Sequence, residues 1–188
     1  GAKQIEEILG APIFRKQKPR KGVGVVNGLA WTALGGTTLA VEASLVHDGS
    51  RGFRQTGQLG DVMRESAQIA YSYVASHLET LGANPGFFDE AMIHLHVPEG
   101  STPKDGPSAG ITMASALLSL ALAIPVSRNL AMTGELTLTG KVLPVGGITE
   151  KIIAARRASI DEIILPADNE RDYDEMPDYL KEGLAVHF

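Results

Sequence analysis

Apolar and small residues recur along this chain with a period that changes from segment to segment. Over residues 60–81 they return every three or four positions, which predicts a helix. Gly82 follows and is placed to end that helix, because glycine readily adopts the left-handed conformation of a C-terminal cap. Residues 91–97 instead alternate between two faces and predict a strand that ends before Pro98.

The remaining pattern predicts two hairpins and several short elements. Residues 22–46 hold two apolar, β-branched runs around the pair Gly35-Gly36, as in a β-hairpin. Residues 130–138 and 141–145 flank Thr139-Gly140 in the same way. The other predicted elements are helices over 108–123 and 148–159 and strands over 163–165 and 184–188. Because helices and hairpins are intermixed without a regular βαβ alternation, we predict an α+β fold with mixed sheets, hairpins and several helices.

The composition fits one compact folded unit. The chain has 188 residues, of which 44% are hydrophobic and 21% charged, so it can bury a substantial core. The net charge of -5 and the lack of a dense Lys/Arg cluster predict no nucleic-acid binding. The longest apolar stretch, residues 111–126, is interrupted by polar residues and proline, so no membrane span is predicted. Without cysteine there is neither a disulfide framework nor a cysteine nucleophile.

The N-terminal part differs from the rest. Residues 14–21 (FRKQKPRK) are basic with little apolar content, which predicts a solvated surface, with docking to an acidic neighbour as the alternative. The chain begins abruptly with GAKQIEEILG and lacks the order of a signal peptide. We therefore expect a piece of a longer protein.

Ser108 is a candidate nucleophile in the segment PKDGPSAG, residues 103–110. Gly106 permits unusual backbone angles, Pro107 fixes the entry angle, and the small residues after the serine leave room for a substrate carbonyl. Backbone N–H groups of the following helical turn, or of the Asp105-Gly106 bend, would face a developing oxyanion. The alternative is an ordinary serine N-cap.

Lys151, in the segment GGITEK, is the candidate base, because a serine needs a neighbour to take its proton at neutral pH. It follows Gly146-Gly147 closely and is predicted in the first turn of its helix, where unpaired N–H groups disfavour an ammonium. Burial would act in the same direction, and a neutral amine is a competent general base. The alternative is a surface lysine paired with Glu150.

Three segments together resemble the proteolytic domain of the Lon family of ATP-dependent proteases, in its bacterial A-type pattern. They are HVPEGSTPKDGPSAG, AMTGELTLTGKVLPVGGITEKIIAARRA and GDVMRESAQIA. The resemblance covers residues 22–188, and PKDGPSAG with a downstream GG-x-x-EK is highly specific. It implies a serine endopeptidase in which Ser108 and Lys151 form a Ser-Lys dyad without a catalytic histidine.

The resemblance also assigns supporting residues. Thr133, in the segment MTGE, is implied to hold the lysine amine, and an ordinary hairpin threonine is the alternative. Glu135 is a weaker candidate that could instead form only a salt bridge. Asp105, beside Gly106 in the serine turn, could regulate access or orientation through hydrogen bonds or serve simply as a turn residue.

His94 and His96 share one strand face in the segment IHLHVPEG. Two histidines without a third ligand at suitable spacing make a weak case for zinc, so we predict a structural or site-lining role and no metal. Trp31 and Glu42 fall in the first hairpin, which the resemblance implies to form a wall near the active site and subunit contacts. We expect Trp31 to be a buried core residue.

The resemblance implies a larger assembly. The chain has no G-x-x-x-x-G-K-[ST] phosphate loop, so we predict no cofactor for this domain. ATP and Mg²⁺ are implied for an upstream ATPase module of the same polypeptide, from which residues 1–21 would be the linker. A homo-hexameric ring, unfolded or damaged proteins as substrates and a cytoplasmic location are implied as well. Two other function classes stay open: a non-enzymatic Lon-like module, and an esterase or amidase for small molecules.

Overall fold

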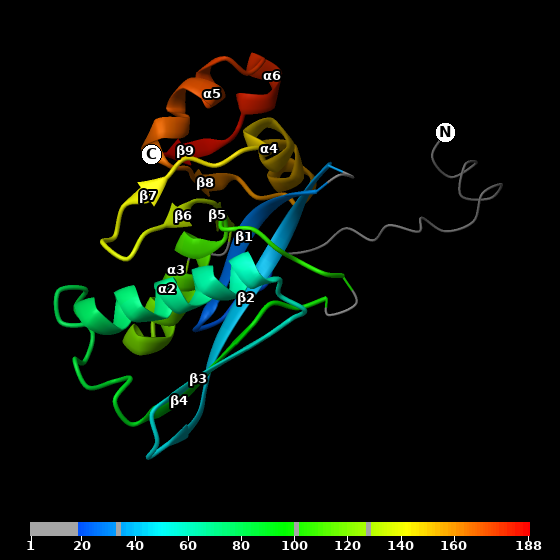
Figure 1. Ribbon diagram of the computed structural model, residues 1–188. Helices are drawn as coiled ribbons and strands as arrows, with labels where there is room; N and C mark the ends of the chain where they lie inside the picture. Colours follow the sequence, from blue (N-terminus) through cyan, green and yellow to red (C-terminus); the bar gives the residue numbers. More distant parts are fainter. Residues whose placement is uncertain (1–18, 33–34, 100–101, 127–128) are drawn as a thin grey trace.

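The computed structural model describes residues 19–32, 35–99, 102–126 and 129–188 (Figure 1). Most of the predicted linker and of the basic stretch lies outside these ranges. The strands are β1 (Val25–Thr32), β2 (Gly35–Asp48), β3 (Gly52–Thr56), β4 (Ala91–His96), β5 (Leu130–Met132), β6 (Glu135–Leu136), β7 (Val142–Leu143), β8 (Glu162–Ile164) and β9 (Ala185–His187). The helices are α2 (Asp61–His77), α3 (Gly110–Leu122), α4 (Ile148–Arg157), α5 (Glu170–Asp174) and α6 (Asp178–Lys181), with a 3₁₀ turn at Ala167–Asn169.

Seven strands form one mixed sheet in the order β3-β4-β2-β1-β5-β8-β9, and β6 pairs with β7 separately. The β1–β2 and β2–β4 pairs are antiparallel. The β3–β4, β1–β5, β5–β8 and β8–β9 pairs are parallel. This mixture of hairpins, helices and a mixed sheet confirms the α+β prediction.

The first predicted hairpin is confirmed, and the second is partly wrong. β1 and β2 pair without a break from Val25 opposite Glu42 to Thr32 opposite Gly35. In the second case only β6 and β7 form the hairpin. β5, at the start of the predicted run, lies in the main sheet between β1 and β8, where Ala131 is fully buried. Burial between two parallel neighbours outweighed the local hairpin pattern there.

The two long predicted helices are confirmed with shifted ends. α2 ends at His77, but helical turns continue to Gly82, whose φ is 81°. Gly82 N–H donates to the Glu79 carbonyl and Ala83 N–H to the Leu78 carbonyl, the bond pattern of a glycine C-cap. α3 begins at Gly110 with Ala109 as its N-cap, so the alternative reading of Ser108 as the N-cap is wrong.

Helices cover both faces of the main sheet. Successive strand residues point to opposite faces, so Val26 and Leu29 of β1 belong to different cores. Val26 packs in the core under α2 and α3, whereas Leu29 packs with Ile148 and Ile152 of α4. α3 contacts both α2 and the β1–β2 hairpin, while α4 contacts the same hairpin from the other core. Figure 1 shows α4, α5 and α6 grouped with β8 and β9 at one end of the molecule.

Two sequence expectations differ from the structure. Trp31 is 59% exposed, so its prediction as a buried core residue is wrong. It lies near the end of β1, and its side chain packs beside the backbone of Gly147 instead of entering either core. The edge strand β3 was not predicted, because its five residues carry an exposed arginine and a glycine and show no clear alternation.

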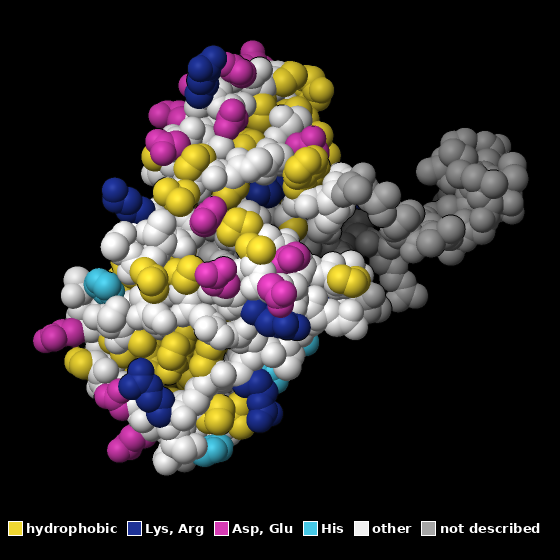
Figure 2. Space-filling model, in the orientation of Figure 1, with side chains coloured by type: hydrophobic (Ala, Val, Ile, Leu, Met, Phe, Trp, Pro, Cys, Tyr) yellow, Lys and Arg dark blue, Asp and Glu magenta, His cyan; other side chains and the backbone are white. Residues whose placement is uncertain are grey.

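Two further observations concern membrane-spanning helices and the distribution of charge on the surface. No helix in the described ranges is long and apolar enough to cross a bilayer. On the face in Figure 2, basic side chains lie singly among acidic ones.

Candidate active site

Lys151 lies in the first turn of α4, as predicted, and its side chain points into the protein. Its backbone N–H donates to the carbonyl of Gly147, and the residue is only 2% exposed. Within the described ranges no carboxylate forms an ion pair with it, so the alternative of a surface lysine paired with Glu150 is wrong. Burial lowers the pKa of Lys151 from 10.5 to about 8, because the charged form loses its hydration.

Thr133 connects Lys151 to the serine segment. It directly follows β5 and is 1% exposed. Lys151 Nζ donates to Thr133 Oγ1 at 3.0 Å, and Thr133 Oγ1 donates to the backbone carbonyl of Ser108 at 3.2 Å. A hydroxyl can accept one hydrogen bond while donating another, so Thr133 Oγ1 makes both contacts at once and its single donor is used. The threonine therefore holds both the amine and the serine backbone.

Ser108 lies just before α3, at the point where that helix meets the end of β5. Its carbonyl also accepts a hydrogen bond from Gly134 N–H at 2.9 Å, and Ile111 N–H donates to the Gly134 carbonyl. These contacts join the serine turn to the residues after β5. No hydrogen bond links Ser108 Oγ directly to Lys151 Nζ, and the connection runs through Thr133 instead.

The backbone around Ser108 leaves amides free. Gly106 has a φ of 109°, the left-handed region that favours glycine, and its N–H donates to the Asp105 carboxylate. Within the described chain the N–H groups of Ser108 and Ala109 have no acceptor. The amides of Ser108 and Ala109 are therefore open to an incoming oxygen, whereas that of Gly106 is occupied by the Asp105 carboxylate.

Asp105 holds the serine turn against α2. Its Oδ1 accepts a hydrogen bond from Met63 N–H at 2.9 Å in the first turn of α2, in addition to that from Gly106. The hydrogen bonds from Met63, first, and Gly106 hold the pKa of Asp105 below its usual value. Gly60 is the N-cap residue of α2, and Asp105 supplies a capping hydrogen bond to the first turn of this helix from a segment far away in sequence.

The two predicted histidines lie apart from the dyad contacts. Thr56 Oγ1 is 2.8 Å from His94 Nε2 and 2.7 Å from His96 Nδ1, and neither ring hydrogen-bonds Ser108 or Lys151. Burial, followed by the charges of His96 and Arg54, lowers the pKa of His94. In the described part of the chain no three His, Cys, Asp or Glu side chains are arranged to hold a metal ion.

Glu135 lies in β6, opposite Leu143 of β7. It forms no ion pair with any described residue. Glu135 lies near Thr133 only because the two residues are close in the sequence.

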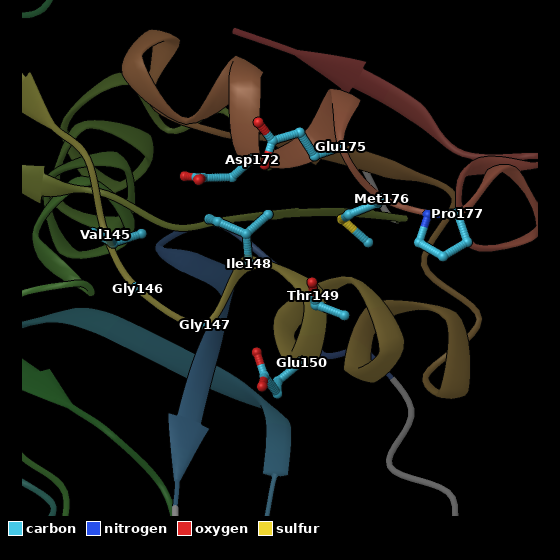
Figure 3. A pocket seen from close by; sticks show the side chains of 10 residues that line it. All are labelled: Val145, Gly146, Gly147, Ile148, Thr149, Glu150, Asp172, Glu175, Met176 and Pro177. Atoms are coloured by element: carbon cyan, nitrogen blue, oxygen red, sulfur yellow. The ribbon is translucent and has the colours of Figure 1, made fainter.

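A cavity of about 400 Å³ lies on the outer side of the first turn of α4 (Figure 3). In Figure 3 Ile148 lies below Asp172 and beside Met176, and the loop of Gly146 and Gly147 forms one wall of the cavity. Neither Ser108 nor Lys151 lines this cavity. It therefore lies beside the helix that carries Lys151 without including the buried amine.

Sequence reasoning missed two residues that hold the loops of the site. Asn169 Oδ1 accepts from Val145 N–H, and Asn169 Nδ2 donates to the Val145 carbonyl, which secures the loop leading into α4. Lys104 contacts three backbone carbonyls around the serine segment. No local pattern marks either residue, because Val145 lies far from Asn169 along the chain and the Gly57 carbonyl lies far from Lys104.

Comparison with known proteins gives one consistent result. The model of the Lon protease (S16) C-terminal proteolytic domain matches residues 1–188. The chain is 64% identical over 184 residues to Lon protease 2 of Hydrogenovibrio crunogenus, covering 98% of the chain and 21% of the relative. It is 58% identical over 187 residues to Lon protease 1 of Syntrophotalea carbinolica, covering 99% of the chain and 23% of the relative.

A more distant organism gives a similar match. The mitochondrial Lon protease homolog of Mus musculus is 54% identical over 194 residues, covering 98% of the chain and 20% of the relative. The chain spans about a fifth of the length of the curated relatives it matches. Together with the family match over all residues, these identities confirm the resemblance seen in the sequence. The chain therefore belongs to the family of Lon (S16) C-terminal proteolytic domains and is a serine protease domain.

Proposed function

We propose that this chain hydrolyses peptide bonds in unfolded or damaged proteins with Ser108 as nucleophile and Lys151 as general base. The observation that carries the proposal is the buried amine of Lys151. It is 2% exposed, has a pKa lowered to about 8 by burial, and hydrogen-bonds only to Thr133 among the described residues. A lysine so placed is partly neutral near neutral pH and can accept a proton.

The reaction proceeds through an acyl-enzyme. Neutral Lys151 takes the proton from Ser108 Oγ as the oxygen attacks the substrate carbonyl, and it then returns the proton to the leaving amine. Water releases the acyl group in the second step, with the same amine acting as base. Because Lys151 Nζ is hydrogen-bonded to Thr133 and not to Ser108 Oγ, the two groups have to come within hydrogen-bond reach for the first transfer.

The backbone supports the charge that develops in this step. The N–H groups of Ser108 and Ala109 have no acceptor within the described chain, and they precede the N-terminus of α3. We assign them as the donors that stabilise the oxyanion, since preorganised amides at a helix start favour negative charge. Asp105 and Gly106 support the turn that presents them.

The wider assembly is also a proposal. Residues 22–188 form the proteolytic domain and residues 1–21 the linker from an ATPase module, which uses ATP and Mg²⁺ in the longer protein. Six copies form a ring that encloses the serines, and the protein acts in the cytoplasm. The relatives named Lon protease, which are about five times longer than this chain, support the presence of further modules in the longer protein.

Site-directed variants test the proposal. We expect Ser108→Ala and Lys151→Ala each to abolish cleavage of an unfolded protein while circular dichroism stays unchanged, because paired catalytic groups act as a unit. Lys141→Ala, at an exposed lysine of the β6–β7 hairpin region, is the control and keeps the parent rate. Equal cleavage by Lys151→Ala and the parent would contradict the assignment of the base.

A second substrate separates the function classes. Parallel assays with a small ester distinguish a protease from an esterase, because a protease cleaves both and an esterase only the ester. A chain that cleaves neither substrate, and that no serine-directed covalent probe labels, would be the non-enzymatic module.

A further inference from the structure

Lys104 lies four residues before Ser108, in the segment that joins β4 to α3. Its Nζ is within hydrogen-bond distance of three backbone carbonyls, at 3.1 Å from Gly57, 2.8 Å from Glu99 and 3.0 Å from Thr102. An ammonium group has three donors and no acceptor, so these contacts use its full capacity. Lys104 is half-buried, and its ammonium has no donor left for a further partner.

The three carbonyls belong to two different segments. Glu99 and Thr102 precede Lys104 in the serine segment, so two of the bonds close that segment on itself. Gly57 follows β3, and the third bond ties the segment to the connection between β3 and α2. The backbone of Lys104 strengthens the same joint, because its N–H donates to the Gln58 carbonyl and its carbonyl accepts from Gly60 N–H.

The residues that follow Lys104 make contacts that reach as far as Ser108, the proposed nucleophile. Directly after Lys104, the Asp105 carboxylate caps α2 through Met63 N–H. The Ser108 carbonyl is then held by Thr133 and Gly134 at the end of β5. The serine turn is therefore held by two anchors. Lys104 and Asp105 form the first anchor, before the turn, and Thr133 forms the second, at the carbonyl of Ser108.

The chemistry of the first anchor depends on charge. Hydrogen bonds from an ammonium are stronger than those from a neutral group, and an apolar side chain of the same length would leave three carbonyls without this donor. Arginine keeps the charge and several donors but presents them in a planar fork, which fits three converging carbonyls less well. The site therefore distinguishes lysine from both replacements.

We propose that Lys104 is a positioning residue, whose ammonium holds the serine segment so that Ser108 is presented to Lys151. This inference rests on the proposed function, because it requires Ser108 to be the nucleophile. Lys104 takes no part in proton transfer, since all three of its donors are bound to backbone carbonyls. It acts through the backbone on the rate of the step at Ser108 and leaves substrate affinity unchanged.

Labelling kinetics with a fluorophosphonate probe test this role in Lys104→Met and Lys104→Arg. Small displacements of a reacting group slow a reaction by about 10- to 100-fold, so we expect such a loss in the limiting labelling rate of Lys104→Met. The probe concentration at half the limiting rate stays as in the parent, and Lys104→Arg regains part of the rate. Lys141→Met, which removes the same charge at an exposed position, is labelled like the parent.

The outcomes separate the two proposals. Labelling of Lys104→Met at the parent rate, with Ser108 as the labelled residue in both, would overturn the positioning role and leave the proposed function intact. Labelling of the parent that persists in Ser108→Ala would overturn the proposed function and this inference with it. A change confined to half-saturation, without a change in limiting rate, would assign Lys104 to probe binding and would also contradict the proposal.

A measurement on the unaltered chain covers the case in which Lys104→Met does not fold. Acetic anhydride modifies free amines, so Lys104, with its three bonded donors, should react more slowly than Lys141 in the folded protein. The two rates become equal in concentrated urea. Equal rates in the folded protein would show that the ammonium is not held and would overturn the inference.

Discussion

Lys151 and Lys104 show how the number of acceptors around an amine sets its role. Lys104 has three backbone carbonyls, which stabilise an ammonium, whereas Lys151 has one hydroxyl and is 2% exposed. Burial lowers the pKa of both side chains, and that of Lys151 falls to about 8. An amine that is buried with one neutral partner is readily deprotonated, so Lys151 suits proton transfer and Lys104 suits anchoring.

The lowered pKa of Lys151 predicts a pH dependence of both acylation and stability. The labelling rate of Ser108 should rise as the pH passes through about 8, because the neutral amine is the proposed base. The unfolded chain holds this proton up to about pH 10.5, so between pH 8 and 10.5 it binds more protons than the folded chain. Rising pH therefore stabilises the fold through Lys151 in this window, and the burial penalty is greatest below about pH 8.

Lys151→Met isolates the free-energy cost of burying the Lys151 amine in the folded protein. The penalty is about 3 kcal/mol at pH 7, and the variant loses one hydrogen bond, so we expect a net gain in the free energy of unfolding of roughly 1–3 kcal/mol. The gain should shrink toward pH 10, as urea unfolding at both pH values would measure. A variant less stable than the parent at pH 7, or a gain that does not change with pH, would contradict a neutralised Lys151.

At the scale of elements, the proposed site depends on three ends that meet: the start of α3, the end of β5 and the start of α4. The β1–β2 hairpin controls the last of these, because α4 lies against it. A Cβ at Gly36 of β2 would collide with the backbone carbonyl of Glu150 in the first turn of α4. Glycine at this position allows the close approach that brings Lys151 under the hairpin.

Gly36→Ala should therefore displace the first turn of α4. The collision is with backbone, which cannot move aside cheaply, so we expect a loss of about 1–3 kcal/mol in the free energy of unfolding and slower cleavage. Gly146→Ala is the matched control, since a Cβ there meets no atom within 4 Å. Denaturant unfolding and peptidase assays of both variants test the prediction, which fails if they behave alike.

At the scale of the whole molecule, the sheet separates two cores that each support part of the site. The core under α2 and α3 fixes the helix that follows Ser108, and the core under α4 fixes the helix that carries Lys151. β1 and β5 lie between them, so Thr133 at the end of β5 is reached from both sides. The proposed dyad thus joins two layers of the fold.

The core under α4 should affect both the stability of the fold and the rate of cleavage. Ile152 is fully buried beside Lys151, so Ile152→Ala should cost about 2–5 kcal/mol in the free energy of unfolding and reduce cleavage by loosening α4. Ile153, the next residue, is 38% exposed, and Ile153→Ala should change stability by only about 0.5 kcal/mol. Thermal unfolding of the pair provides the measurement, and similar losses in both would contradict the assigned orientation of α4.

Most elements and the family could be predicted from the sequence, because their signals are local. Periodicity marked α2 and α4, a long run of small and apolar residues marked α3, a glycine pair marked the β1–β2 hairpin, and the segments PKDGPSAG and GGITEK marked the family. Trp31, β3 and β5 were misread or missed, because their burial and pairing depend on strands and helices elsewhere in the chain.

The sequence by itself determined which residues are proposed to carry the chemistry, since a serine in a glycine-rich turn and a lysine after a glycine pair are recognisable from their neighbours. Only the tertiary structure decided how they act. The link from Lys151 through Thr133 to the Ser108 carbonyl, and the three carbonyls around Lys104, join segments that are far apart along the chain. Removal of water from the Lys151 amine requires a complete core, and no local pattern of residues can encode that environment.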